Sequence, residues 1–320
     1  MTHKPFYPGL TGLRGLAAVG IVLMHLRGNG GYAITGFIYD RVIASFTDLV
    51  FFFMVLSAFC LCCGYAESMQ DGRCDLAAFY GRRVRRLWPL FALLAAVELA
   101  CAPSWAALCE AFSDWTLLGG FLPDPEAVSV VGAGWFLGLE AVFCLCFPFF
   151  CVLLASKRRA WCAFAVCLVW SFVAAAHFGL GRASILYSAC YFMAGGLCWL
   201  YRERLAAVPI WLRLAALCAA VAAYYAAGGG TLACLAVSVC LVAVGLGGAR
   251  PLEANPLCAF GRVSGEVYLC HMAAFRVLER LHLVHALGDG WATFGAAAVL
   301  TLAISAAAGT VWLRLERRLP

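Results

Sequence analysis

Apolar segments long enough to cross a membrane follow one another along almost the whole chain. A helical span needs about 20 mostly apolar residues, since each residue adds about 1.5 Å across a hydrocarbon core of about 30 Å. No polar stretch between these segments is long enough for a second, soluble domain. Inside lipid, only helices and closed barrels satisfy all backbone hydrogen-bonding groups. The sequence therefore predicts an all-α, polytopic membrane protein, with residues 1–320 forming one transmembrane domain.

About ten spans can be placed, which agrees with a chain that is 64% hydrophobic and 12% charged, whereas soluble proteins are roughly 25% charged. A longer connection, residues 103–134, contains prolines, acidic residues and amphipathic pieces and is expected along the membrane interface. A turn of three glycines, Gly228 to Gly230, is expected between the seventh and eighth spans. The expected spans are residues 9–26, 46–65, 87–102, 135–155, 160–177, 183–201, 211–227, 231–247, 257–278 and 291–313.

Basic clusters follow every second span, so all of them fall on one side of the membrane. Loops rich in Arg and Lys stay in the cytoplasm, which predicts cytoplasmic termini, an outer connection at 103–134 and a multi-pass protein of the plasma or inner membrane. The formal charge of +6 comes largely from these clusters, so no nucleic-acid surface is implied. The clusters lie at residues 82–86, 157–159, 202–204, 250 and 314–318.

Eighteen cysteines lie mostly within the apolar runs, where a thiol behaves as a small hydrophobic group. Cys60 and Cys63 have the spacing of a zinc or redox pair, but no second pair at ligand spacing accompanies them. No metal site is therefore expected.

The first expected span carries two ionisable residues, Arg14 and His25, with ten residues between them. Eleven helical steps make almost three turns, so both side chains leave from nearly the same face, about 16 Å apart. Ionisable groups inside a bilayer are costly and usually mark a functional site. The same pair is also compatible with an arginine that reaches the headgroups and a histidine satisfied by a neighbouring helix. Taken alone, the two residues leave both interpretations open.

Three further segments contain candidate site residues. The loop expected at 79–89, FYGRRVRRLWP, holds four arginines that can bind phosphates or anionic lipid, or serve only the topology. Glu140 lies a few residues into a span and would need a partner or a watery cavity. In the ninth expected span Tyr268 and His271 are three residues apart and so share a helix face.

Five segments resemble, in order, those of the integral-membrane acyltransferases of family 3, which modify cell-surface glycans, peptidoglycan and similar acceptors. The basic segment places Arg83 and Arg86 at the two arginine positions of the family's basic loop. The family's usual glycine, serine and aromatic residue are replaced at Ala58, Phe136 and Glu266, which leaves the acceptor open. The five segments are LTGLRGLAAVGIVLMHL, FFFMVLSAFCL, FYGRRVRRLWPLF, GWFLGLEAVFCLCFP and SGEVYLCHM.

The resemblance implies transfer of an acyl group, first of all acetyl, from acetyl-CoA or another acyl-CoA to a hydroxyl of an extracytoplasmic, cell-surface glycan or lipid-linked acceptor. His25 would act as general base or as a transient acyl carrier. Arg14 would hold the donor or stabilise charge on its carbonyl oxygen. Arg83 and Arg86 would bind the phosphates of CoA on the cytoplasmic side.

Two other classes of function remain compatible with the residues. A proton-coupled transporter or flippase would use Arg14, His25, Glu140 and His271 as a path through the membrane. Inverted repeats with paired broken helices would favour it, and none is visible in the sequence. The third class is an acyltransferase-like membrane sensor without turnover.

Overall fold

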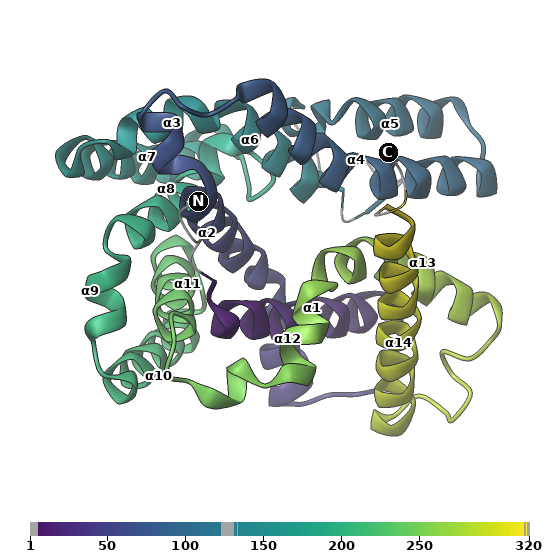
Figure 1. Ribbon diagram of the computed structural model, residues 1–320. Helices are drawn as coiled ribbons and strands as arrows, with labels where there is room; N and C mark the ends of the chain where they lie inside the picture. The colour runs from purple at the N-terminus through teal and green to yellow at the C-terminus, as the bar shows by residue number, and fades with distance from the viewer. Residues whose placement is uncertain (1–5, 123–130, 133, 317, 319–320) are drawn as a thin grey trace. The chain divides into compact units, whose positions relative to one another are not determined.

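The chain folds into helices joined by short connections, as the computed structural model shows (Figure 1). The structure describes residues 6–122, 131–132, 134–316 and 318, the side chain of Leu87 excepted. Among these residues there is no strand, and the sole β-type pairing is an isolated bridge between Ala286 and Gly288. The prediction of an all-α fold is confirmed.

Among the described residues, six helical segments are long and apolar enough to cross a membrane. They confirm the class of polytopic membrane protein, while the number ten and the cytoplasmic termini stay predictions. Two shorter apolar helices, α8 (Ile185–Leu200) and α11 (Thr231–Gly245), come in addition. The six are α1 (Pro8–Asn29), the helical stretch Ile38–Gln70, α6 (Trp135–Leu154), α7 (Lys157–Phe178), α10 (Ile210–Ala227) and α14 (Trp291–Glu316).

The chain divides into two compact units. The terminal unit joins Pro8–Val50 to Ala249–Pro320, and the central unit joins Met1–Tyr7 to Phe51–Gly248. The expectation of one transmembrane domain stays a prediction, and each unit is described by itself below.

The terminal unit is built around α1. Two glycines bring α1 close to α12 (Asn255–Arg262), because a Cβ on Gly15 would lie 3.2 Å from the Cα of Gly261. A Cβ on Gly261 would overlap the carbonyl of Thr11. Small residues at such a crossing let two helix backbones touch. In the same unit α13 (Ser264–Arg280) packs against α14.

The ninth expected span, 257–278, is corrected by the structure, since it consists of two helices. α12 ends at Arg262 and α13 starts at Ser264. The carbonyl of Gly261 near the end of α12 accepts a hydrogen bond of 2.9 Å from the Ser264 hydroxyl. Side chains that satisfy terminal carbonyls in this way stabilise a helix end.

The expected loop at 79–89 is a second correction, because the whole basic segment is helical. It lies inside α4 (Leu76–Cys101), which includes Pro89 and begins eleven residues before the expected span at 87. Asp75 caps the helix, its carboxylate accepting a hydrogen bond of 3.1 Å from the N–H of Ala78. A capped start and good helix formers such as arginine and leucine explain the longer helix.

The connection after α4 contains α5 (Trp105–Thr116) and the 3₁₀ turn η4 (Leu118–Phe121), so its expected helical piece is present. Residues 123–130 of this connection lie outside the described residues. The glycine turn between α10 and α11 is confirmed, with φ of 72°, 93° and 101° at Gly228 to Gly230, a region that favours glycine. The remaining elements are η1 (Ile38–Ile43), η2 (Phe46–Asp48), α2 (Leu49–Leu61), η3 (Cys62–Ala66), α3 (Glu67–Gln70), α9 (Arg202–Ala207) and η6 (Arg250–Glu253).

Candidate active site

Within the terminal unit, α1 and α13 bring two histidines into direct contact. Nδ1 of His25 lies 3.1 Å from Nε2 of His271 and 3.0 Å from the carbonyl oxygen of Ile21, one turn earlier on α1. Nδ1 of His271 lies 2.6 Å from the carbonyl oxygen of Tyr268. The ring centroids are 4.8 Å apart. His271 is fully buried, and His25 is half-buried. The structure thus joins two residues that were singled out separately in the sequence.

Arg14, the second ionisable residue of α1, is held by the end of α12. Its Nε and Nη2 atoms donate hydrogen bonds of 3.1 and 2.7 Å to the carbonyl oxygen of Gly261. A cation is favoured there because the carbonyl end of a helix carries partial negative charge. The contact therefore fixes the side chain against α12, and its expected role toward the donor stays a prediction.

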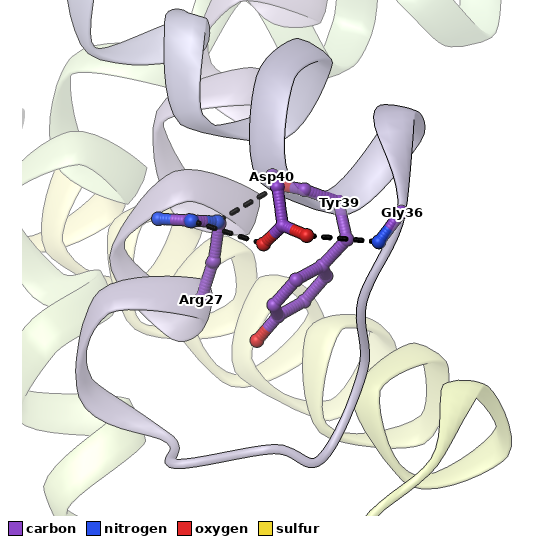
Figure 2. Close-up of polar contacts among 4 residues, drawn as sticks. All are labelled: Arg27, Gly36, Tyr39 and Asp40. Carbon is purple, nitrogen blue, oxygen red and sulfur yellow. Dashed lines mark hydrogen bonds and ion pairs between the residues drawn. The ribbon is translucent and has the colours of Figure 1, made fainter.

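Two residues after His25, an arginine ties the end of α1 to the next helix, as Figure 2 shows. The Nε of Arg27 donates to the carbonyl oxygen of Tyr39 at 2.8 Å, and its Nη2 lies 3.3 Å from the Asp40 carboxylate. The other carboxylate oxygen of Asp40 accepts a hydrogen bond of 2.8 Å from the N–H of Gly36. The contacts hold the segment between α1 and η1 in place.

The sequence does not predict these contacts of Arg27 with Tyr39 and Asp40, called the Arg27 clamp below. Arg27 and Asp40 are thirteen residues apart and belong to no common helical face. The available signal was an arginine and an aspartate on either side of a glycine-containing connection. Asp40 lies in η1, a π-helical segment, and such segments are frequent at functional sites.

Tyr268 and Glu266 also lie on α13 and are buried. Tyr268 reaches His271 through its carbonyl oxygen, and the side-chain rings are 5.9 Å apart. Glu266 packs toward Gly309 of α14, since a Cβ on that glycine would lie 2.6 Å from the Cβ of Glu266. Of the expected site residues, the terminal unit therefore brings together His25, Tyr268 and His271. Arg14 lies eleven residues before His25 on α1.

The remaining expected site residues lie in the central unit. Arg83 and Arg86 are three residues apart on α4 and so share a face. Arg86 is exposed, whereas Arg83 is half-buried with its guanidinium 5.5 Å from the ring centre of Tyr65. The Nε of Arg83 is buried and has no hydrogen-bond partner among the described residues.

Arg83 lines a cavity of about 200 Å³ between α4, α6 and the end of α5 with η4. Its walls are otherwise mainly apolar. Arg83 thus lines this cavity, and its buried Nε has no acceptor among the described residues. The apolar walls include Val84, Leu117, Leu118, Phe121, Val142 and Leu145.

Glu140 is buried on α6 and has the partner that its place in a span required. One carboxylate oxygen accepts a hydrogen bond from the hydroxyl of Ser57. The other oxygen is buried without a partner in the described part of the chain. Glu140 also lies within electrostatic range of Arg83 and Arg86.

α5, whose end lines this cavity, contains a carboxyl group with a raised pKa. Burial, and then the negative charge of Glu110 one turn earlier, raise the pKa of Asp114 from 3.8 to about 7. Its Oδ2 atom is buried and unpartnered within the described residues. Leu117, at the end of the same helix, lines the cavity beside Arg83.

The architecture and the paired histidines define a multi-pass membrane protein with a polar, partly buried centre inside one unit. A family model described as an acyltransferase domain matches residues 7–310. The chain therefore belongs to acyltransferase family 3, which confirms the resemblance of its five segments. No curated protein and no solved structure matches the chain.

Proposed function

We propose that this protein is a membrane O-acyltransferase that moves an acyl group, first of all acetyl, from cytoplasmic acyl-CoA to a hydroxyl of a cell-envelope acceptor. The acceptor class is a cell-surface glycan or a lipid-linked acceptor. The observation that carries the proposal is the half-buried imidazole of His25, hydrogen-bonded to the buried His271 in a chain of an acyltransferase family.

The expected reaction is a proton-assisted attack on a thioester. The imidazole of His25 takes the proton of the acceptor hydroxyl while the hydroxyl oxygen bonds to the thioester carbonyl carbon. The carbon–sulfur bond then breaks, and the leaving thiolate of CoA takes the proton back from the imidazolium. The products are an ester and CoA with a free thiol. A route through an acyl-histidine gives the same products in two steps.

Arginines of both units support binding and charge stabilisation in this proposal. Arg14 stabilises the negative charge that develops on the carbonyl oxygen or holds the donor. Arg83 and Arg86 bind CoA phosphates, since guanidinium groups bind phosphate through paired hydrogen bonds. The buried, unpartnered Nε of Arg83 supports this role.

The activity test uses the full chain in lipid nanodiscs with acetyl-CoA labelled in its acetyl group. Labelled acetate released from the envelope by base should depend on the gene, and the purified protein should release CoA. His25→Ala should lower the rate about 10²- to 10⁴-fold, the usual contribution of general acid–base catalysis. His177→Ala, at an exposed position on α7, is the control.

Two results would contradict the proposal. One is an unchanged acetylation rate in folded His25→Ala protein. The other is solute flux that needs no acyl-CoA, which would identify a transporter.

Donor binding is tested separately with acetyl-CoA by calorimetry. Arg83→Ala and Arg86→Ala should each weaken acetyl-CoA binding about tenfold or more, as expected for the loss of a charged hydrogen-bond partner. Arg85→Ala, an exposed arginine of the same helix, is the control. Unchanged affinity in Arg83→Ala and Arg86→Ala would mean that these arginines serve only the membrane topology and do not bind the donor.

A further inference from the structure

The hydrogen bonds around His271 determine which of its ring nitrogens carries the proton. Nδ1 lies 2.6 Å from the carbonyl oxygen of Tyr268, and a carbonyl can only accept. Nδ1 must therefore donate. The same two helices contribute Val22, Leu26, Val267 and Phe275 to a buried apolar cluster, where a charged ring is costly. His271 is accordingly neutral, with Nε2 as an acceptor.

The same reasoning applied to His25 gives its tautomer. Nδ1 of His25 faces two acceptors, Nε2 of His271 at 3.1 Å and the carbonyl oxygen of Ile21 at 3.0 Å. A proton on Nδ1 satisfies both contacts, whereas a lone pair there would oppose both. Since a neutral imidazole carries one proton, Nε2 of His25 holds the lone pair.

We infer that His271 is a positioning residue, which holds the proton on Nδ1 of His25 and thereby makes Nε2 of His25 the basic nitrogen of the reaction. This inference rests on the proposed acyl transfer. The acceptor hydroxyl passes its proton to Nε2, and the imidazolium formed is stabilised because its Nδ1–H already donates to His271. Nε2 then returns the proton to the leaving thiolate. In the acyl-histidine route the same nitrogen would carry the acyl group.

Replacing His271 separates this role from simple packing. His271→Phe keeps a ring but removes the acceptor, so kcat should fall roughly 10- to 100-fold, less than the full general-base contribution because Ile21 still accepts from Nδ1. The KM for acetyl-CoA should change less than about twofold, since binding of the donor is not involved. In His271→Gln the amide oxygen can take the place of Nε2 as acceptor and should restore much of kcat.

The pH profile gives a readout that a packing defect would not move. Without the acceptor, the imidazolium of His25 loses stabilisation, so the acidic limb of kcat/KM should move to lower pH in His271→Phe and return in His271→Gln. Neither variant changes the other titratable or charged groups of the elements packed on α1. These are Glu266, Tyr268, Cys270, Arg276, Glu279 and Arg280 on α13, Cys258 and Arg262 on α12, Arg250 and Glu253 on η6, Tyr39, Asp40 and Arg41 on η1, and Asp48 on η2; α14 has none between residues 291 and 313.

A measurement without turnover keeps the inference testable if a variant fails to fold or no acceptor is found. In ¹⁵N-histidine-labelled wild-type protein, the signals of the two residues are assigned by their loss in His25→Gln and His271→Gln. Both should show a protonated Nδ1 and an unprotonated Nε2 above neutral pH. A proton on Nε2 of His25 would overturn the inference even if acyl transfer is observed. The expected tautomers without any acyl transfer would refute the proposed function alone.

Unchanged kcat and an unmoved acidic limb in folded His271→Phe would also overturn the positioning role. Equal losses in His271→Phe and His271→Gln, with no shift of the limb in either, would make His271 a packing residue. His177→Phe is the matched control for replacing a histidine by a phenylalanine.

Discussion

Arg14 and Arg83 are both expected to serve the acyl donor, yet their surroundings differ. Arg14 has two of its donors bonded to the carbonyl oxygen of Gly261. Arg83 keeps a buried Nε without an acceptor in the described chain, beside a cavity of about 200 Å³. An arginine bound to backbone is already stabilised by its own protein, whereas one with an unpartnered donor gains most from a ligand. The comparison predicts that loss of Arg14 affects stability as well as its proposed role toward the donor, and that loss of Arg83 affects mainly donor binding.

The largest effect should come from the glycine that supplies the acceptor of Arg14. Gly261→Ala places a Cβ against the carbonyl of Thr11 and should lower the free energy of unfolding by about 3 kcal/mol, as overpacking does. Gly265→Ala, which has open space around its position, should change it by about 1 kcal/mol at most. Thermal unfolding in detergent measures both. Equal stability of the two variants would show that the close contact between α1 and α12 at Gly261 does not contribute to stability.

The stability of the protein should depend on pH through Asp114, which lies on α5 near the cavity beside Arg83. The folded state keeps a proton on this carboxyl up to about pH 7, whereas the unfolded chain releases it near pH 4. Stability should therefore fall as pH rises through this window, by an amount on the order of 3 kcal/mol, and stay low above it.

Asp114→Asn removes the titration, so its advantage in thermal stability over wild type should grow from pH 4 to pH 8. Asp71→Asn, at an exposed position, controls for replacing a carboxylate by an amide. A constant difference between Asp114→Asn and wild type across this range would show that Asp114 ionises normally.

Removing each guanidinium tests the comparison directly. Arg14→Met loses hydrogen bonds of a charged group to a backbone carbonyl and should cost about 1.5–3 kcal/mol of stability. Arg83→Met should cost less than about 1 kcal/mol, because its Nε has no acceptor to lose within the described part of the chain, while acetyl-CoA binding weakens. Unfolding and calorimetry on both variants give the two quantities. A stability loss in Arg83→Met as large as that in Arg14→Met would show that the two arginines contribute equally to folding, which would contradict the comparison.

A third arginine provides the smallest effect and a baseline. The side chains of the Arg27–Asp40 pair are 30% and 46% exposed, and such pairs contribute about 0.2–1 kcal/mol. A double-mutant cycle of Arg27→Gln and Asp40→Asn should give a coupling energy in that range. A coupling above about 2 kcal/mol would mean that the Arg27 clamp acts as a buried pair.

Much of the fold follows from apolar length alone. α1, α6 and α14 lie within a few residues of their expected spans, because long apolar runs have no other stable arrangement in lipid. The charges of the basic segment predict a loop, whereas its helix formers and the capping carboxylate of Asp75 make it helical. The break after α12 depends on side chains that satisfy the carbonyl of Gly261, one of them 247 residues away, which no local pattern contains.

The candidate site was predictable as a set of residues but not as an arrangement. Arg14 and His25 stand out because they share a helix with few other polar groups. The contact between His25 and His271 joins residues 246 positions apart, so only the packing of α13 on α1 reveals it. Their proton positions follow from two backbone carbonyls, which are invisible in the sequence.

The positions of two of the eighteen cysteines have a practical consequence. α4 has 26 residues, about 39 Å of helix, and cysteines stand at both ends of it, Cys74 just before and Cys101 at its last position. If the basic helix crosses the membrane in the expected direction, an impermeant maleimide should label Cys101 on intact cells and Cys74 only after permeabilisation. The native chain thus carries chemical reporters for topology on both sides of this helix, although Cys109, exposed on α5, should be labelled together with Cys101.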